Sequence, residues 1–123
     1  MSEWLALFVA GGTGACMRVG LARTVDLWLA ASLPNAGVLV VNVLGSLAIG
    51  ALSVLVPEGT MRIAVLAGLL GGFTTYSSFA LLLVELGGGG RWGMALLQGA
   101  LHLIGGIAAV IVGLWLGKLL RPG

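Results

Sequence analysis

The side chains in this sequence that could do chemistry are neutral hydrogen-bonding groups set within apolar stretches. They are Asn42, Thr74, Thr75, Tyr76, Ser77, Ser78, Gln98 and His102. Neutral donors without counter-charges suit a small, strongly hydrated anion, whose water shell must be replaced when it leaves bulk water. The edges of aromatic rings carry partial positive charge and can add to such a site. Tyr76 and Phe79 are three residues apart, so their rings share one face of a helix.

The same inventory excludes several classes of function. The acidic residues all fall at the ends of the apolar stretches or between them, at Glu3, Asp26, Glu58 and Glu85. No carboxylate therefore lies at membrane depth to couple cation export to protons. One cysteine and one histidine cannot form a metal cluster by themselves. No catalytic arrangement is present, so we predict that the protein is not an enzyme, and no basic cluster points to nucleic acid.

Composition indicates the elements that must position these donors. Of the 123 residues, 59% are hydrophobic and 8% are charged, which is typical of an integral membrane protein. At about 20 apolar residues per crossing, the chain has room for about four transmembrane helices and almost nothing else. We expect an all-α fold in a single domain over residues 1–123, with spans at about 4–22, 36–56, 62–86 and 92–117.

The third span is predicted to be broken at its centre. Residues 68–79 read GLLGGFTTYSSF, in which glycines weaken the helix and hydroxyl side chains can bond to nearby backbone groups. Backbone that leaves helical geometry at membrane depth must be buried in protein or line a wet cavity. Breaks of this kind often hold ions. The alternative is a kinked span whose small residues serve helix packing.

Polar residues in the other spans each have two interpretations. Arg18, near the end of the first span, either reaches out to the membrane surface or borders a pore mouth. Asn42 either bonds to another helix or donates its amide N–H groups to an anion. Gln98, His102 and Gly106 are four apart and form one polar stripe. His102 is either a neutral residue bonded to a neighbouring helix or a residue that borders water in a vestibule and titrates near neutral pH.

The basic residues divide evenly between the two sides of a four-span chain. The two sets are Arg62, Lys118 and Arg121 on one side, and Arg18, Arg23 and Arg91 on the other. Three against three gives no preference under the positive-inside rule, so the chain can insert in both orientations. We therefore predict a dimer of two copies in opposite orientation, related by a two-fold axis in the membrane plane.

Three motifs carry a resemblance to a known family. Residues 11–18 read GGTGACMR, residues 37–46 read GVLVVNVLGS, and residues 68–79 carry the glycine and hydroxyl pattern already described. In order and spacing these motifs resemble those of the Fluc fluoride-channel family, also called CrcB proteins. The resemblance covers all four spans.

The resemblance implies a passive channel that lets fluoride leave the cell, in a multi-pass protein of a bacterial cell (inner) membrane. It also implies an antiparallel, dual-topology dimer with two fluoride pores and a structural sodium ion at its centre. Matched by position, backbone carbonyls of Gly71 and Thr74 from both subunits would hold the sodium ion. The implied fluoride-pore residues are Asn42, Tyr76, Phe79, Ser77, Ser78, Gln98 and His102.

The chain also departs from the family pattern. Tyr76 stands where the family usually has Phe, and Gln98 and His102 stand where it usually has Tyr and Ser. One chain of a heterodimeric fluoride channel is an alternative, although the balanced charges argue against a fixed orientation. A small dual-topology multidrug-type transporter is another, but the chain lacks the first-span glutamate of that class. A third is an accessory membrane subunit with no transport role.

Overall fold

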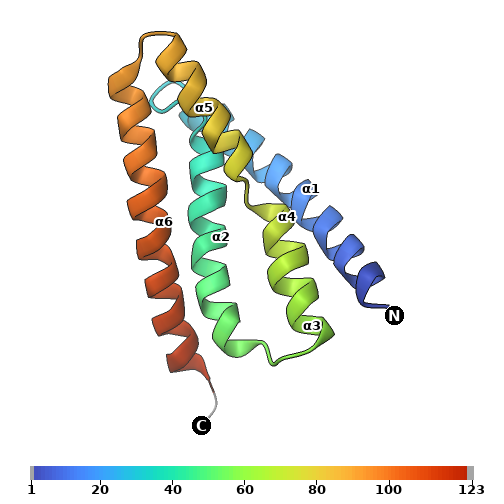
Figure 1. Cartoon of the computed structure of the whole chain (residues 1–123). Helices are drawn as coiled ribbons and strands as arrows, with labels where there is room; N and C mark the ends of the chain where they lie inside the picture. The colour runs from blue at the N-terminus through green and yellow to red at the C-terminus, as the bar shows by residue number, and fades with distance from the viewer. Residues whose placement is uncertain (1, 122–123) are drawn as a thin grey trace.

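The chain is built from long helices joined by short connections in the computed structural model, which describes residues 2–121 (Figure 1). In order they are α1 (Glu3–Leu29), α2 (Ala36–Leu55), α3 (Thr60–Arg62), the π-helix η1 (Ile63–Leu70), α4 (Gly71–Phe73), α5 (Tyr76–Gly88) and α6 (Trp92–Leu120). Segments α3, η1, α4 and α5 together form the third span. Four helical segments are long and apolar enough to cross a bilayer. The protein is therefore an all-helical, multi-pass membrane protein.

The first helix is longer than the sequence pattern indicated. It continues to Leu29, whereas we expected its end near residue 22. The segment from Arg23 to Leu29 contains neither Gly nor Pro, so nothing in it ends a helix. The Asp26 carboxylate accepts a hydrogen bond from the Gly37 N–H at 2.8 Å, which ties the end of α1 to the start of α2. The other spans begin and end within about three residues of the expected positions.

The third span is broken within residues 68–79, as predicted, and the break lies just after the glycine pair. Gly71 and Gly72 are helical, whereas Thr74 and Thr75 are extended, with ψ angles of 159° and 114°. The helix resumes at Tyr76 as α5, and Figure 1 shows the change of direction between α4 and α5. Upstream, η1 is an eight-residue π-helix, which the sequence pattern did not predict. Such segments are rare and are frequently found at functional sites.

Gly72 has a packing role at this point. A Cβ atom there would meet the Gly11 carbonyl and would lie 3.2 Å from the Ala15 amide nitrogen of α1. Gly14 of α1 is equally confined, with the Phe73 amide nitrogen 2.9 Å from where its Cβ would be. The glycines therefore let α1 and the third span approach backbone to backbone, and α1 supports the segment that leads into the break.

Helices α2 and α6 lie side by side along most of their length (Figure 1). Gly113 and Gly117 of α6 face α2, where Cβ atoms would meet the backbone around Ala51. Gly50 of α2 is confined in the same way against Gly113 and Leu114. This close packing makes the α2–α6 pair a firm support for the polar residues that both helices carry.

Much of the apolar side-chain surface of one copy is exposed. Large side chains such as Phe8, Leu96 and Ile104 are more than half exposed, as is expected for helices that face lipid or another subunit. In Figure 1 the start of α1, the α2–α3 turn and the end of α6 lie toward one end of the molecule. The α1–α2 and α5–α6 connections lie toward the other end, as four successive crossings require.

Candidate functional site

A cavity of about 400 Å³ lies beside the break in the third span. Parts of α2, η1, α4, α5 and α6 and both extended threonines contribute to its wall. Its lining residues are Asn42, Gly45, Ser46, Ile49, Leu66, Leu70, Gly71, Thr74, Thr75, Tyr76, Phe79, His102 and Leu103. The cavity therefore combines an apolar wall with a small set of neutral polar groups, as ligand sites commonly do.

Asn42 of α2 is bonded to the backbone of the break. Its Nδ2 donates to the Thr75 carbonyl at 2.9 Å, and its Oδ1 accepts from the Thr75 N–H at 2.8 Å. The Asn42 amide thus pairs with Thr75 as a neighbouring β-strand would. It satisfies the N–H and C=O of Thr75, which have no helical partner at the break. Because Nδ2 carries two hydrogens, one remains available to donate elsewhere.

Thr75 connects the break to α5. It is the N-cap of α5, with its Oγ1 accepting from the Ser78 N–H at 3.2 Å. The same hydroxyl donates to Ser78 Oγ at 3.0 Å and lies 3.3 Å from Ser77 Oγ. The three hydroxyls form a connected group at the N-terminus of α5, where the helix dipole favours negative charge.

These contacts change which carbonyls are available at the break. The Thr75 N–H, which would reach the Gly71 carbonyl in a continuous helix, bonds to Asn42 instead. The Ser78 N–H, which would reach the Thr74 carbonyl, bonds to Thr75 Oγ1. Among the described residues, the carbonyl oxygens of Gly71 and Thr74 are thus deprived of their usual i+4 donors. These two carbonyl oxygens carry partial negative charge, so they are suited to bind a cation.

Arg18 of α1 lies next to this pair. Its Nε donates to the Gly72 carbonyl at 3.1 Å, and the residue is half-buried. Arg18 is not one of the residues that line the cavity. The long side chain therefore satisfies a third carbonyl near the break, between the two that lose their donors.

Three rings follow one another along the wall formed by α5 and α6. Tyr76 and Phe79 meet edge to face, with centroids 6.0 Å apart and an interplanar angle of 69°. Phe79 stacks on His102 at 4.2 Å and 21°. His102 Nδ1 is 2.9 Å from the Gln98 carbonyl, which can only accept, so Nδ1 carries the hydrogen. His102 Nε2 is buried without a hydrogen-bond partner in residues 2–121.

The structure gathers some of the predicted site residues and separates others. Asn42, Gly71, Thr74, Tyr76, Phe79 and His102 line the cavity together. Ser77 and Ser78 do not line it and reach it through the Thr75 hydroxyl. Gln98 is fully buried elsewhere, and its Nε2 donates to the Pro34 carbonyl of the α1–α2 connection at 2.6 Å.

Sequence reasoning missed Ser46 as a lining residue. Ser46 is one helical turn after Asn42, so the two share the face of α2 that borders the cavity. That spacing was the signal that could have identified it.

Comparison with known proteins identifies the chain at the level of its family. A family model described as "CrcB-like protein, Camphor Resistance (CrcB)" matches residues 5–114. The chain belongs to the CrcB family. The resemblance drawn from the three sequence motifs is therefore confirmed, and the matched region of this CrcB chain contains all the cavity-lining residues.

Relatives of this CrcB chain match over nearly their whole length. A protein of Aeromonas salmonicida is 37% identical over 94% of this chain and 96% of its own. A protein of Opitutus terrae is 36% identical over 100% of this chain and 95% of its own. A protein of Dichelobacter nodosus is 38% identical over 96% and 98%, respectively. Each of the three is named "Fluoride-specific ion channel FluC".

Proposed function

We propose that this chain forms a fluoride channel that lets the anion leave the cell passively, in the membrane of a bacterium. The observation that carries the proposal is the near-complete match to bacterial relatives that are named fluoride-specific ion channels. The protein is accordingly not an enzyme. The cavity supports the same function, because its polar groups are neutral donors and ring edges rather than fixed charges.

Fluoride would replace its water shell with donors at the break. The second Nδ2 hydrogen of Asn42 and the hydroxyls of Ser77 and Ser78 would supply hydrogen bonds, because the Thr75 hydroxyl already donates to Ser78. The face of Phe79 is covered by His102, which leaves its positive edge to meet the anion. None of these contacts carries a full charge, so the anion can be released as readily as it enters.

The functional unit of this proposal is an antiparallel dimer with two pores. The exposed apolar surface of one copy and the even division of basic residues support it. A reporter fused to the C-terminus should show both orientations in one cell. A single orientation would remove the homodimer and favour the heterodimeric alternative.

A structural sodium ion between the two copies is part of the same proposal. The residues fit such an ion, because the carbonyls of Gly71 and Thr74 have lost their helical donors. Two carbonyls from each copy would give four oxygen ligands without any carboxylate. The ion would supply positive charge that holds the two breaks together across the two-fold axis.

Efflux from liposomes tests the function directly. Purified protein should release fluoride down its gradient without a proton or sodium gradient, and should release chloride far more slowly. Efflux that requires a proton gradient would favour the multidrug-type transporter. No efflux of either anion from a folded, dimeric preparation would favour the accessory subunit.

A further inference from the structure

A second cavity, of about 580 Å³, lies where α2 and α6 end and the third span begins. Its lining residues are Ser53, Val54, Val56, Pro57, Glu58, Arg62, Lys118 and Arg121. In the described part of the chain, none of these residues also lines the cavity beside the break. Lys118 and Arg121 also lie beyond the stretch that the family model matches.

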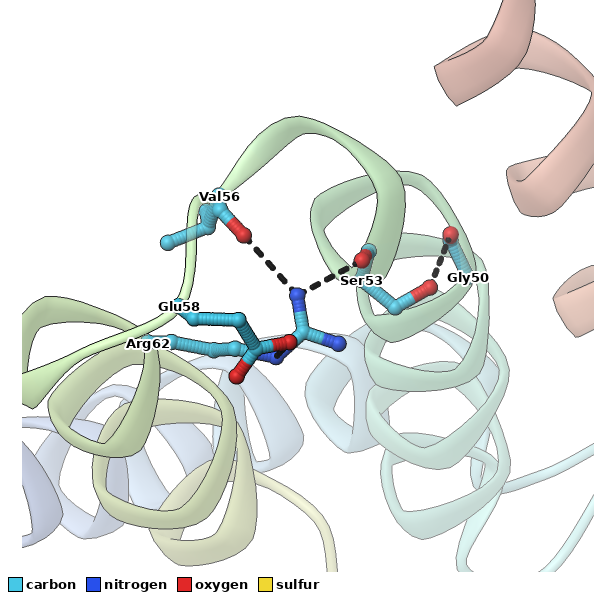
Figure 2. Close-up of polar contacts among 5 residues, drawn as sticks. All are labelled: Gly50, Ser53, Val56, Glu58 and Arg62. Carbon is cyan, nitrogen blue, oxygen red and sulfur yellow. Dashed lines mark hydrogen bonds and ion pairs between the residues drawn. The ribbon is translucent and has the colours of Figure 1, made fainter.

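Arg62 is held rigidly on one wall of this cavity. Its Nη1 donates to the Ser53 carbonyl at 2.7 Å and to the Val56 carbonyl at 2.8 Å (Figure 2). Its Nε lies 3.4 Å from Glu58 Oε1. Arg62 thereby closes the C-terminal end of α2, whose last carbonyls need donors. Its Nη2 has no acceptor among residues 2–121 and keeps two N–H groups for a ligand.

The charges around this cavity are mostly positive. Three of the six Lys and Arg residues of the chain line it, namely Arg62, Lys118 and Arg121. Glu58 is the one carboxylate among the lining residues, and its side chain is 89% exposed. An ion pair this exposed is strongly screened by water, so Glu58 offsets only part of the positive charge. Neither Lys118 nor Arg121 makes a hydrogen bond or ion pair within residues 2–121.

A purely structural role explains part of this arrangement. Lys118 lies in the last turn of α6, where a cation complements the helix dipole. Arg62 likewise places a cation at the C-terminal end of α2, where it complements the dipole of that helix. This explanation does not require the three cations to line one cavity, and it gives no role to the open space that they surround. An anion with several acceptor oxygens would satisfy all three at once.

We propose that this cavity binds the headgroup of an anionic phospholipid, with its phosphate between Arg62, Lys118 and Arg121. The position favours a lipid, because the cavity lies at the end of the membrane-spanning helices. Trp115, one turn before Lys118 on α6, is 60% exposed and offers an interfacial ring beside the glycerol region. Leu119 and Leu120 are also exposed and can contact the acyl chains. The cavity is larger than a phosphate group needs and leaves room for the glycerol.

Native mass spectrometry of the purified protein tests the proposal. Protein in detergent is mixed with phosphatidylglycerol or, separately, with phosphatidylcholine. The parent should retain phosphatidylglycerol preferentially. The double variant Lys118→Gln/Arg121→Gln should lose roughly tenfold or more in its affinity for phosphatidylglycerol, since each Lys or Arg near an anionic surface contributes about fivefold. Both substitutions are at exposed positions, and Arg62 stays in place to close α2.

The matched control is the double variant Arg23→Gln/Arg91→Gln. It removes the same charge from two exposed positions outside this cavity. The control should bind phosphatidylglycerol as the parent does. Equal losses in the two double variants, or no loss in either, would overturn the proposal. Displacement of the lipid by millimolar inorganic phosphate would show a free-phosphate site and would also overturn it. None of these results depends on fluoride conduction.

Discussion

The cavity beside the break and the cavity at the end of the spans differ in the kind of donor that lines them. The first presents an amide, hydroxyls and ring edges, and none of its lining residues is an acid, lysine or arginine. The second presents two arginines and a lysine. At membrane depth a full charge is costly, whereas at the ends of the spans it can be hydrated.

The difference also matches what each cavity is proposed to do. A conducted anion must leave as easily as it enters, so weak, numerous donors serve it better than a full charge. A lipid headgroup stays in place, so direct pairing with cations carries no such penalty. Arg18 lies close to the break but donates to the Gly72 carbonyl, so its hydrogen-bonding capacity is partly committed to the backbone. Depth in the membrane thus selects between two chemistries for binding anions.

Among the variants considered, Asn42→Ala should have the largest effect on fluoride efflux. Asn42→Ala removes an anion donor and leaves the C=O of Thr75 without its partner. An unpaired buried group costs about 1–3 kcal/mol, so fluoride efflux should fall by about tenfold to hundredfold. Cys16→Ala is the control, because this thiol is exposed and does not line the cavity. Equal efflux from the two variants would contradict the assignment of Asn42.

Sodium dependence sharpens the same test. In Asn42→Ala the Thr75 N–H is free to bond back to the Gly71 carbonyl, which removes a proposed sodium ligand. We expect Asn42→Ala to need a higher sodium concentration for half-maximal efflux. Asn42→Asp keeps an acceptor for the Thr75 N–H, so its sodium requirement should stay near that of the parent even if its efflux falls. The same sodium requirement in all three proteins would remove the link between Asn42 and the carbonyls.

A smaller effect, on thermal stability, is expected at Gly71 and Gly72. Substitutions there can separate helix packing from ion binding. Gly72→Ala places a methyl group against the Gly11 carbonyl of α1, whereas the nearest atom to a methyl group at Gly71 is the Leu66 carbonyl oxygen, 4.0 Å away. Overpacking of this kind costs about 1–3 kcal/mol. Thermal unfolding in detergent should show a lower melting temperature for Gly72→Ala than for Gly71→Ala. The reverse order would mean that α1 does not support the break as described.

Local sequence patterns predicted the number of spans, the presence of the break and most of the polar residues that line the cavity. They placed the break within residues 68–79, where glycines weaken a helix and hydroxyl side chains can bond to nearby backbone groups, but they did not single out the residues that leave the helix. Its actual position, at Thr74 and Thr75, depends on Asn42, which is more than 30 residues away in sequence. Contacts between distant residues decide such details, and no local pattern contains them.

The same limit explains two other differences. Gln98 was grouped with His102 by helical spacing, but its partner is the Pro34 carbonyl in a connection that the spacing does not describe. Arg62, Lys118 and Arg121 were assigned to one side of the membrane, but no sequence pattern indicated that they line one cavity. Arg62 and Lys118 come together only because α2 and α6 end beside the start of the third span.

The smallest expected effect concerns His102, which joins the two halves of the comparison because its neutral ring can acquire charge. The structure favours neither of its two interpretations alone. Nδ1 is bonded to the Gln98 carbonyl of its own helix rather than to a neighbouring helix. The ring lines the cavity and stacks on Phe79, with Nε2 lacking a partner among the described residues. A proton gained at Nε2 would put a full charge on the wall of a cavity that otherwise has none.

We therefore expect fluoride efflux by the parent to change modestly, by about twofold to threefold, across the pH range in which histidine ordinarily titrates. His102→Ser replaces the ring with a neutral hydroxyl that does not titrate and should give a flat profile. Acid converts fluoride to HF, which crosses bilayers unaided, so efflux from protein-free liposomes is subtracted at every pH. A positive charge beside the path speeds entry but slows release, so the profile also reports which of the two steps limits conduction. Coincident profiles for the parent and His102→Ser would make His102 a packing partner of Phe79 alone, and the wall of this cavity would then stay uncharged at every pH tested.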